Sequence, residues 1–266
     1  MKSRILVAVV GVPVLLYVVL AAPPLVMALA LCALAGIGSW ELQSCVNSGE
    51  RRGWESIGVL FSAWAVWVYY KRPEHIAIFF VAAGLLVSAC AVFEAGKMKF
   101  QQLAALLFGG MFLSYSFSSF LRLEASGVHR AYLLLPFILS FACDTFAFFA
   151  GLTLGKHKLA PKVSPKKTIE GSIGGLAGNI LCGLLFVWVM ERFFGGSAIG
   201  YGPMAALALL CGVVAQIGDL SFSLIKREFG IKDYGHLFLA HGGVLDRFDS
   251  VLFVAPVVEI IFSLLP

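Results

Sequence analysis

The sequence predicts an all-α membrane protein, a polytopic bundle of about nine transmembrane helices. Of its 266 residues, 60% are hydrophobic and only 13% are charged, whereas soluble domains are about half apolar and a quarter charged. The charges gather in short clusters between apolar runs, and a run of roughly 20 apolar residues crosses a bilayer as a helix. Because backbone polar groups must be paired in lipid, such runs form helices.

Nine apolar runs are expected to span the membrane. The first follows the basic segment 1–4 and lacks a convincing small-residue cleavage site, so we expect a retained helix and not a cleaved signal peptide. The predicted spans are Ile5–Ala22, Leu25–Leu42, Trp54–Tyr70, Ile76–Phe93, Leu103–Leu121, Tyr132–Leu152, Ser172–Phe194, Met204–Ile225 and Gly243–Leu265.

The distribution of basic residues predicts a cytoplasmic N-terminus. With nine spans and the N-terminus inside, most of the 20 Lys and Arg residues fall in the inside segments, as the positive-inside rule expects. The outside segments hold only Lys71, Arg72, Arg122, Arg130 and Arg192. The same basic loops also attract anionic lipid headgroups, so the net charge of +5 does not by itself indicate a substrate.

We expect one integral membrane domain over residues 1–266. Residues 1–125 are mainly plain apolar spans and are expected to form a helical scaffold. Acids, lysines and glycines concentrate between Asp144 and Asp249, in or beside the predicted cytoplasmic loops Gly155–Gly171 and Lys226–Gly242. Because loops on rigid elements tend to carry function, residues 126–266 are expected to be the catalytic half.

Two GxxxG pairs, Gly171/Gly175 and Gly174/Gly178, open the seventh predicted span. Small residues at this spacing let helix backbones approach closely. The pattern fits helix packing, a homodimer, or room for a ligand beside the helix.

Asp144 lies inside the sixth predicted span. An acid at the centre of a span costs roughly 2.5 to 3.5 kcal/mol on insertion scales, so it usually faces a polar cavity and has a function. Ala147 and Gly151 follow on the same helical face and leave room for a ligand. The alternative is a structural partner for a buried Lys or Arg.

The segment Ser164–Gly171 places two lysines just before a predicted helix. Lys166, Lys167 and the helix N-terminus would offer positive charge and N–H groups to phosphates, and Thr168 or Ser172 would cap that helix. Ordinary positive-inside charge explains the lysines equally well. The segment lacks the P-loop pattern.

Carboxylates recur near the predicted cytoplasmic surface. Asp219 shares a helical face with Ser223 and with Lys226 or Arg227, and Asp246 shares a face with Asp249. Mg²⁺ prefers such oxygen ligands together with substrate phosphates, although an intrahelical pair of Asp219 with Lys226 or Arg227 is the alternative.

Residues 241–243, His-Gly-Gly, precede the last predicted helix. Their glycines allow a tight entry into that helix. His241 fits a ligand, a hydrogen-bond donor or a turn residue.

Together these residues predict metal-assisted chemistry on phosphates. A transporter would also use intramembrane acids, but it leaves the lysine segment and the His-Gly-Gly turn unexplained. No basic and aromatic pattern suggests nucleic acid as a partner. The six cysteines lie mostly within apolar spans and contain no CxxC pair, so we expect neither a disulfide framework nor a zinc site.

The C-terminal half resembles the phosphatidate cytidylyltransferases, or CDP-diacylglycerol synthases. The resemblance rests on a stretch of about 27 residues from Ser223 to Asp249 with many fixed positions, namely Ser223–Arg227, Lys232-Asp233 and His241–Asp249. Supporting stretches are Asp144–Gly151, Ser164–Gly171 and Gly218-Asp219. The family usually has Pro or Gly two residues before the histidine and often Gly just before it, where this chain has Leu239 and Ala240.

The resemblance implies transfer of a cytidylyl group from CTP to phosphatidic acid at the cytoplasmic face of the cell inner membrane. It implies Mg²⁺ as cofactor, with room for a second metal ion, and is compatible with a homodimer. The implied catalytic residues are Asp144, Lys167, Asp219, Asp246 and Asp249, and the four aspartates are the implied metal ligands. The implied substrate-binding residues are Ser164, Lys166, Lys167, Ser223, Lys226, Arg227, His241, Gly242, Gly243 and Arg247. Rival interpretations are a polyprenol kinase and a CDP-archaeol synthase.

Overall fold

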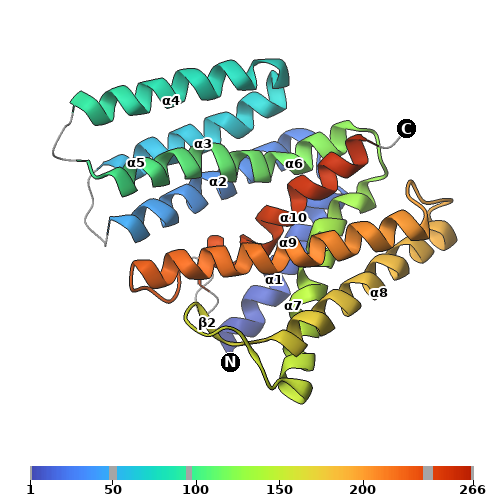
Figure 1. Ribbon diagram of the computed structural model, residues 1–266. Coiled ribbons are helices and arrows are strands. Elements are labelled where there is room, and N and C mark those ends of the chain that lie inside the picture. The colour runs from blue at the N-terminus through green and yellow to red at the C-terminus, as the bar shows by residue number, and fades with distance from the viewer. Residues whose placement is uncertain (1, 48–52, 94–97, 236–241, 265–266) are drawn as a thin grey trace. The chain divides into compact units, whose positions relative to one another are not determined.

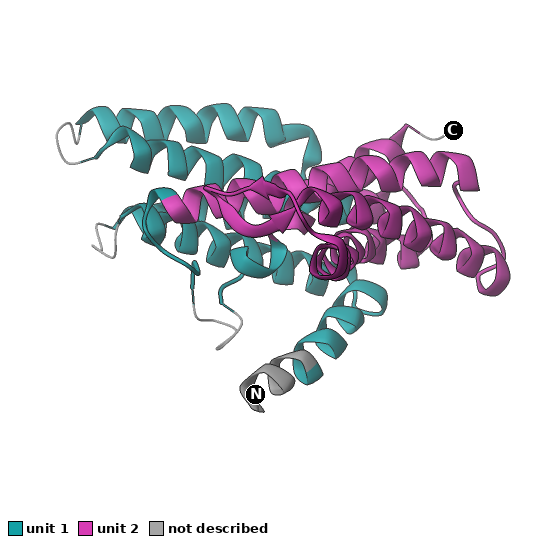
Figure 2. Cartoon of the chain, turned by 60° about the horizontal axis from the view of Figure 1, so that its bottom comes forward, with its two compact units in different colours: residues 1–122, 228–248 teal, residues 123–227, 249–266 magenta. Residues whose placement is uncertain are grey.

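The computed structural model describes residues 2–47, 53–93, 98–235 and 242–264, with side chains from Val9 onward (Figure 1). These residues form helices and one short antiparallel hairpin, so the predicted helical architecture is confirmed. The chain divides into two compact units, residues 1–122 with 228–248 and residues 123–227 with 249–266 (Figure 2).

The first unit contains the N-terminal helices. They are α1 (Lys2–Leu20), α2 (Pro24–Val46), α3 (Trp54–Lys71), the short 3₁₀ helix η1 (Pro73–His75), α4 (Ile76–Phe93), α5 (Phe100–Leu107), the π-helical segment η2 (Phe108–Leu113) and most of α6 (Ser114–Ala125). The unit also includes the beginning of α10 (Leu245–Ser263).

Phe61 of α3 is the centre of the apolar core in the first unit. It packs with Val87 and Leu106, and aromatic side chains of α4 surround it. The π-helical segment brings Gly110 so close that a Cβ there would overlap the Phe61 ring. The missing side chain therefore lets the core close around Phe61.

The second unit contains the C-terminal helices. They are η3 (Arg130–Leu134), α7 (Leu135–Leu154), α8 (Ile169–Phe193), most of α9 (Tyr201–Glu228) and the remainder of α10. The strands β1 (Lys158–Ala160) and β2 (Ser164–Thr168) connect α7 to α8.

Glycines bring α7 and α8 of the second unit into close contact. A Cβ on Gly174 would overlap the Ala150 side chain, one on Gly178 would overlap Phe146, and one on Gly175 would lie 2.8 Å from the Cys143 carbonyl oxygen. The two GxxxG pairs therefore serve helix packing within the chain, which confirms the first of their three interpretations. The homodimer stays a prediction.

Six helical segments among the described residues are long and apolar enough to cross a membrane. They are Pro24–Val46, Pro73–Phe93, Phe100–Ala125, Arg130–Leu154, Ile169–Phe193 and Tyr201–Glu228, and each coincides with a predicted span to within a few residues. The other three predicted spans correspond to helices α1, α3 and α10, which are not among these six segments. The count of nine spans therefore stays a prediction.

Close packing at Gly178 predicts a large effect of a single methyl group. We expect Gly178→Ala to destabilise the protein by about 1 to 3 kcal/mol, because the new Cβ would meet the Cβ and Cγ of Phe146, which cannot move without shifting α7. Chemical denaturation in detergent, followed by helical circular dichroism, measures the change.

Gly202 of α9 is the matched control, because a Cβ there meets nothing within 4 Å. Gly202→Ala should leave stability unchanged or raise it by up to about 1 kcal/mol. Equal losses for the two variants would contradict the packing argument.

Candidate active site

The candidate site lies in the second unit and begins with the β-hairpin, which the sequence did not predict. Lys158 pairs with Thr168 and Ala160 pairs with Ser164 in antiparallel register. At the base of the hairpin, the carboxylate of Glu170 accepts the backbone N–H of Lys156 at 3.0 Å. The same carboxylate lies 2.6 Å from Nδ1 of His157. These contacts hold the lysines of β2 on an ordered strand.

Thr168 is the last residue of β2 and caps the N-terminus of α8, so it joins the strand to the helix pair. Its Oγ1 accepts the backbone N–H of Gly171 at 3.1 Å, which confirms it as the cap of this helix. A Cβ on Gly171 would lie 2.7 Å from the carbonyl oxygen of Ala147. The backbones of α7 and α8 therefore meet directly beside the strand.

A cavity of about 490 Å³ lies between the hairpin and helices α7, α8 and α9. Its polar lining includes Asp144, Lys167 and Asp219. Its remaining lining residues are Ala147, Phe148, Gly151, Leu152, Lys158, Leu159, Lys166, Thr168, Gly171, Ser172 and Gln216. The mixture of cations, carboxylates and apolar side chains suits a ligand that has both a phosphate and hydrocarbon.

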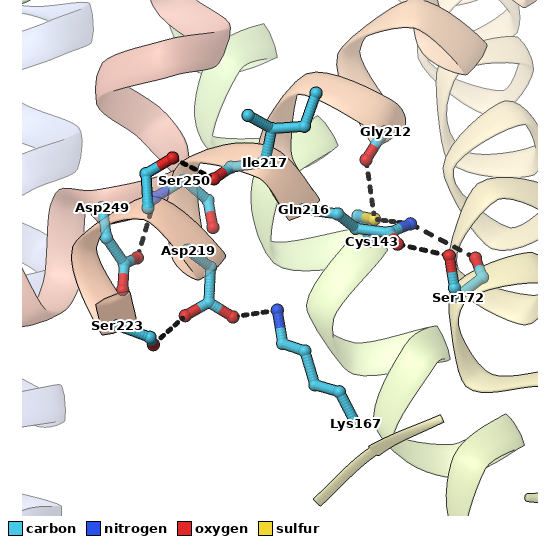
Figure 3. A network of polar contacts seen from close by, with 11 residues as sticks. Cys143, Lys167, Ser172, Gly212, Gln216, Ile217, Asp219, Ser223, Asp249 and Ser250 are labelled. Carbon is cyan, nitrogen blue, oxygen red and sulfur yellow. Dashed lines mark hydrogen bonds and ion pairs between the residues drawn. The ribbon is translucent and has the colours of Figure 1, made fainter. Parts of the chain in front are cut away.

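Lys167 and Asp219 form an ion pair across this cavity (Figure 3). Both side chains are about a quarter exposed, 26% and 23% respectively. On its other oxygen, Asp219 accepts the hydroxyl hydrogen of Ser223 at 3.3 Å, and so the two residues share a helical face as predicted. This ion pair brings Asp219 a cation from β2. The alternative of an intrahelical pair with Lys226 or Arg227 stays a prediction.

Asp144 and Asp249 bring two further carboxyl groups to the same unit. Asp144 lies on α7 and lines the cavity, and the half-buried Asp249 lies on α10. Each is close enough to Asp219 to experience its charge, while Lys167 offsets the charge on Asp144 and Lys226 that on Asp249. Three carboxylates and two lysines thus form one electrostatic cluster.

Gly218 allows α9 and α10 to approach at this cluster. A Cβ at this position would lie 2.8 Å from the Phe253 ring and 2.9 Å from the carbonyl oxygen of Asp249. The Gly218-Asp219 pair therefore combines a close helix contact with an acid one residue later.

The carboxylates of this cluster have the chemistry that Mg²⁺ requires. The described residues contain no group of three His, Cys, Asp or Glu side chains arranged as a ready-made metal cage. Mg²⁺ usually binds through one or two carboxylates and takes its other ligands from waters and substrate phosphates. One or two of Asp144, Asp219 and Asp249 would therefore suit an ion that takes its other ligands from water and from a phosphate.

A second polar network lies at the cavity wall. The side-chain amide of Gln216 accepts the Ser172 hydroxyl hydrogen and donates to the Ser172 carbonyl oxygen at 3.3 Å. It also lies 3.6 Å from Sγ of Cys143 (Figure 3). This network fixes the orientation of an amide and a hydroxyl that line the cavity.

Asp246 belongs to the first unit and is held by backbone groups. Its Oδ2 accepts the N–H of Tyr234 at 2.8 Å and that of Gly243 at 2.9 Å. Gly242 adopts φ +82°, a conformation that glycine tolerates best. The predicted tight entry into the last helix is thus confirmed, and the predicted role of Asp246 as a metal ligand stays a prediction.

Glu41 of α2 contacts the same turn within the first unit. Its side chain is 4% exposed, and its two carboxylate oxygens accept the N–H groups of Val244 and Leu245, each at 2.9 Å. Glu41 falls within the predicted span Leu25–Leu42, where no function was expected. An ionisable residue within a span was the available signal.

The remaining predicted residues fall into three groups. Ser164 and the exposed Lys166 belong to β2, and Lys166 lines the cavity. Lys226 is buried, Arg227 donates from Nε to the Val163 carbonyl oxygen at 3.4 Å, and Arg247 is exposed. His241, Leu239 and Ala240 lie outside the described residues.

Sequence reasoning also missed Ser172 and Gln216 as cavity residues. Ser172 was considered only as a helix cap, and Gln216 lies in an apolar span with an ordinary polar side chain. Because glutamine is uncharged, nothing in the sequence indicated a functional role for Gln216. Its position at the cavity follows only from the contact between α8 and α9.

The model of the Cytidylyltransferase family matches residues 2–265 of this chain. The chain belongs to this family. Phosphatidate cytidylyltransferase from Staphylococcus haemolyticus (strain JCSC1435) is 35% identical over 181 residues, which cover 68% of this chain and 67% of the relative. The enzymes of the same name from Staphylococcus aureus (strain COL) and Staphylococcus epidermidis (strain ATCC 12228) are 34% and 35% identical over the same shares.

The pairing of Lys167 with Asp219 in this family member predicts a measurable energetic coupling. Lys167→Met should destabilise the protein because it leaves Asp219 beside Asp144 and Asp249 without its ion-pair partner. Asp219→Asn in the same chain should recover part of the loss. A double-mutant cycle on unfolding in detergent should give a coupling of about 1 to 2 kcal/mol.

Lys162, an exposed lysine in the turn of the hairpin, provides the control. Lys162→Met should change stability by less than about 0.5 kcal/mol and show no coupling to Asp219→Asn. Additive effects of Lys167→Met and Asp219→Asn would argue against the ion pair.

Proposed function

We infer that the protein is a phosphatidate cytidylyltransferase that converts CTP and phosphatidic acid into CDP-diacylglycerol and pyrophosphate. The match to the family over residues 2–265 carries this inference. Relatives named phosphatidate cytidylyltransferase also align with this chain over two thirds of their own length. The cavity of the second unit offers both lysines and carboxylates to phosphates. A mostly helical, apolar chain also suits a lipid substrate.

The reaction requires one bond to form and one to break. A phosphate oxygen of phosphatidic acid attacks the α-phosphorus of CTP, and the bond from that phosphorus to the oxygen bridging to the β-phosphorus breaks. Pyrophosphate leaves with the electron pair. No covalent intermediate with the protein is needed, so catalysis rests on positioning and on charge stabilisation.

The lysines of β2 would hold the phosphates. Lys166 is exposed at the cavity and is able to meet an incoming phosphate directly. Lys167 pairs with Asp219, so it would exchange or share this carboxylate when a phosphate arrives. Such a lysine acts as a point charge against the phosphate, and Lys226 and Arg227 are further candidates.

Asp144, Asp219 and Asp249 are the carboxylates that we assign to Mg²⁺. When bound, Mg²⁺ would neutralise phosphate charge and stabilise the leaving pyrophosphate. These acids are grouped without a complete cage of their own, which supports an ion shared with the nucleotide. The ion is expected to dissociate from the protein when chelator is added.

The membrane setting follows from the two substrates. Phosphatidic acid stays in the bilayer because of its acyl chains, whereas CTP stays in water. We propose that the site faces the cytoplasm of the cell inner membrane, with nine spans and the N-terminus inside. The lysine-rich hairpin that borders the cavity fits this orientation under the positive-inside rule.

A product assay tests the proposed function. Purified protein in detergent receives phosphatidic acid, Mg²⁺ and CTP labelled at the α-phosphorus, and label is counted in the lipid fraction together with released pyrophosphate. We expect equal amounts of labelled lipid and pyrophosphate. EDTA should abolish both, and added Mg²⁺ should restore them.

Two variants connect this activity to the cavity. Asp219→Asn should lower kcat by about 100-fold or more, because it removes a carboxylate that would hold Mg²⁺ against the phosphates of CTP. Lys162→Met should retain the activity.

Transfer of the γ-phosphate to a polyprenol would indicate a kinase instead, and ion flux in sealed vesicles without any use of CTP would indicate a transporter.

A further inference from the structure

Glu41 is a buried acid within an apolar helix that the proposed mechanism does not use. It lies on α2, and its side chain is 4% exposed. Burying a carboxylate without partners costs several kcal/mol. The energetic cost requires compensation from specific contacts, and the structure provides them on a single turn of the chain.

The compensation comes from the first N–H groups of α10. Val244 and Leu245 each donate a backbone N–H to Glu41, one to each carboxylate oxygen, at 2.9 Å. The first N–H groups of a helix have no partner within the helix, and a negative charge there is favoured by the helix dipole. A side chain of α2 therefore caps a helix that begins about 200 residues later.

Two glycines leave room for this carboxylate. A Cβ on Gly243 would overlap the Glu41 carboxylate, and one on Gly235 would lie 2.6 Å from its Oε1. Any other residue at these positions would displace Glu41 or move the turn. The turn is therefore closely fitted to the Glu41 side chain.

Asp246 and Glu41 accept different backbone N–H groups at this turn. Its Oδ2 accepts the N–H groups of Tyr234 and Gly243, while Glu41 takes the next two along the chain. Without Glu41, the N–H groups of Val244 and Leu245 would lack an acceptor beside the same turn. Asp246 is the neighbouring carboxylate that they would attract, and its orientation would change.

We propose that Glu41 is a positioning residue that fixes the turn Gly242–Asp246 and thereby the orientation of Asp246 and Arg247. This inference rests on the proposed cytidylyltransferase function, because the resemblance assigns Asp246 and Arg247 to its site. Glu41 itself would not touch the substrate. Its effect on the reaction passes through the backbone of the turn.

Glu41→Gln is the most informative variant. Its side-chain oxygen is still able to accept one N–H, but its amide nitrogen would face the other donor, so one of the two contacts is lost. We expect amide hydrogen exchange in the peptide covering residues 242–248 to be faster. Per folded molecule, kcat should fall by about 10-fold or more while the KM for CTP changes less than about threefold, because misorientation affects the transition state more than substrate binding.

Glu55→Gln is the matched control. Glu55 is likewise buried, at 3% exposure, but it lies on α3 and accepts a hydrogen bond from the Asn47 side chain at 2.7 Å, which glutamine is also able to accept. This variant should leave both the exchange at residues 242–248 and kcat unchanged. Gly243→Ala tests the same contact from the other side, in case Glu41→Gln fails to fold.

Faster exchange together with a lower kcat in Glu41→Gln or Gly243→Ala supports the proposal. Unchanged exchange in both variants overturns the contact, and faster exchange with normal kcat per folded molecule overturns the positioning role. Wild-type protein that forms no labelled lipid would overturn the proposed function instead, and the exchange measurement would still decide the Glu41 contact.

Discussion

The ion pair between Lys167 and Asp219 is the interaction on which the candidate site depends. It joins the hairpin β2 to helix α9 across a cavity of about 490 Å³. It also places a cation among three carboxylates that would otherwise repel one another at close range. Without this pair β2 would lose its ionic contact with α9, and Asp144 and Asp219 would lose the cation that offsets their charge, whereas Lys226 would still offset that of Asp249. Lys167, held by Asp219, lines the cavity into which we propose that a phosphate enters.

Backbone contacts between helices make this arrangement possible. Glycines allow α7 to pack directly against α8, and Thr168 at the junction both ends the strand and caps the helix. Close backbone approach is a usual means of helix association within a bilayer, where the hydrophobic effect does not drive helices together. Gly218 brings α10 to α9 in a similar way. The acids of the site are thus held on rigid helices, while Lys166 and Lys167 are held on the one strand pair among the described residues.

The sequence predicted the helices well because membrane spans are specified by apolar runs alone. It also predicted Asp144 and Asp219 as functional candidates, since acids in or near spans are costly. It did not predict the hairpin, whose strands are short and polar, or the pairing of Asp219 with Lys167, which depends on contacts between distant segments. An acid within a span is a local signal that marked Glu41 as unusual, but its partners could not be predicted because its donors belong to residues 244 and 245. Local patterns mark which residues carry charge, but tertiary contacts decide their partners.

Protection of a cysteine in the cavity tests the central claim that substrates meet there. In a chain whose native cysteines are replaced, Ala147→Cys lines the cavity and Ala177→Cys lines a separate apolar groove on the same helix pair. The rate of labelling by a thiol reagent is measured with and without CTP, phosphatidic acid and Mg²⁺. The account predicts that substrates slow the labelling of Ala147→Cys several-fold and leave Ala177→Cys unchanged. Equal labelling of Ala147→Cys with and without substrates, in a variant that retains activity, would contradict it.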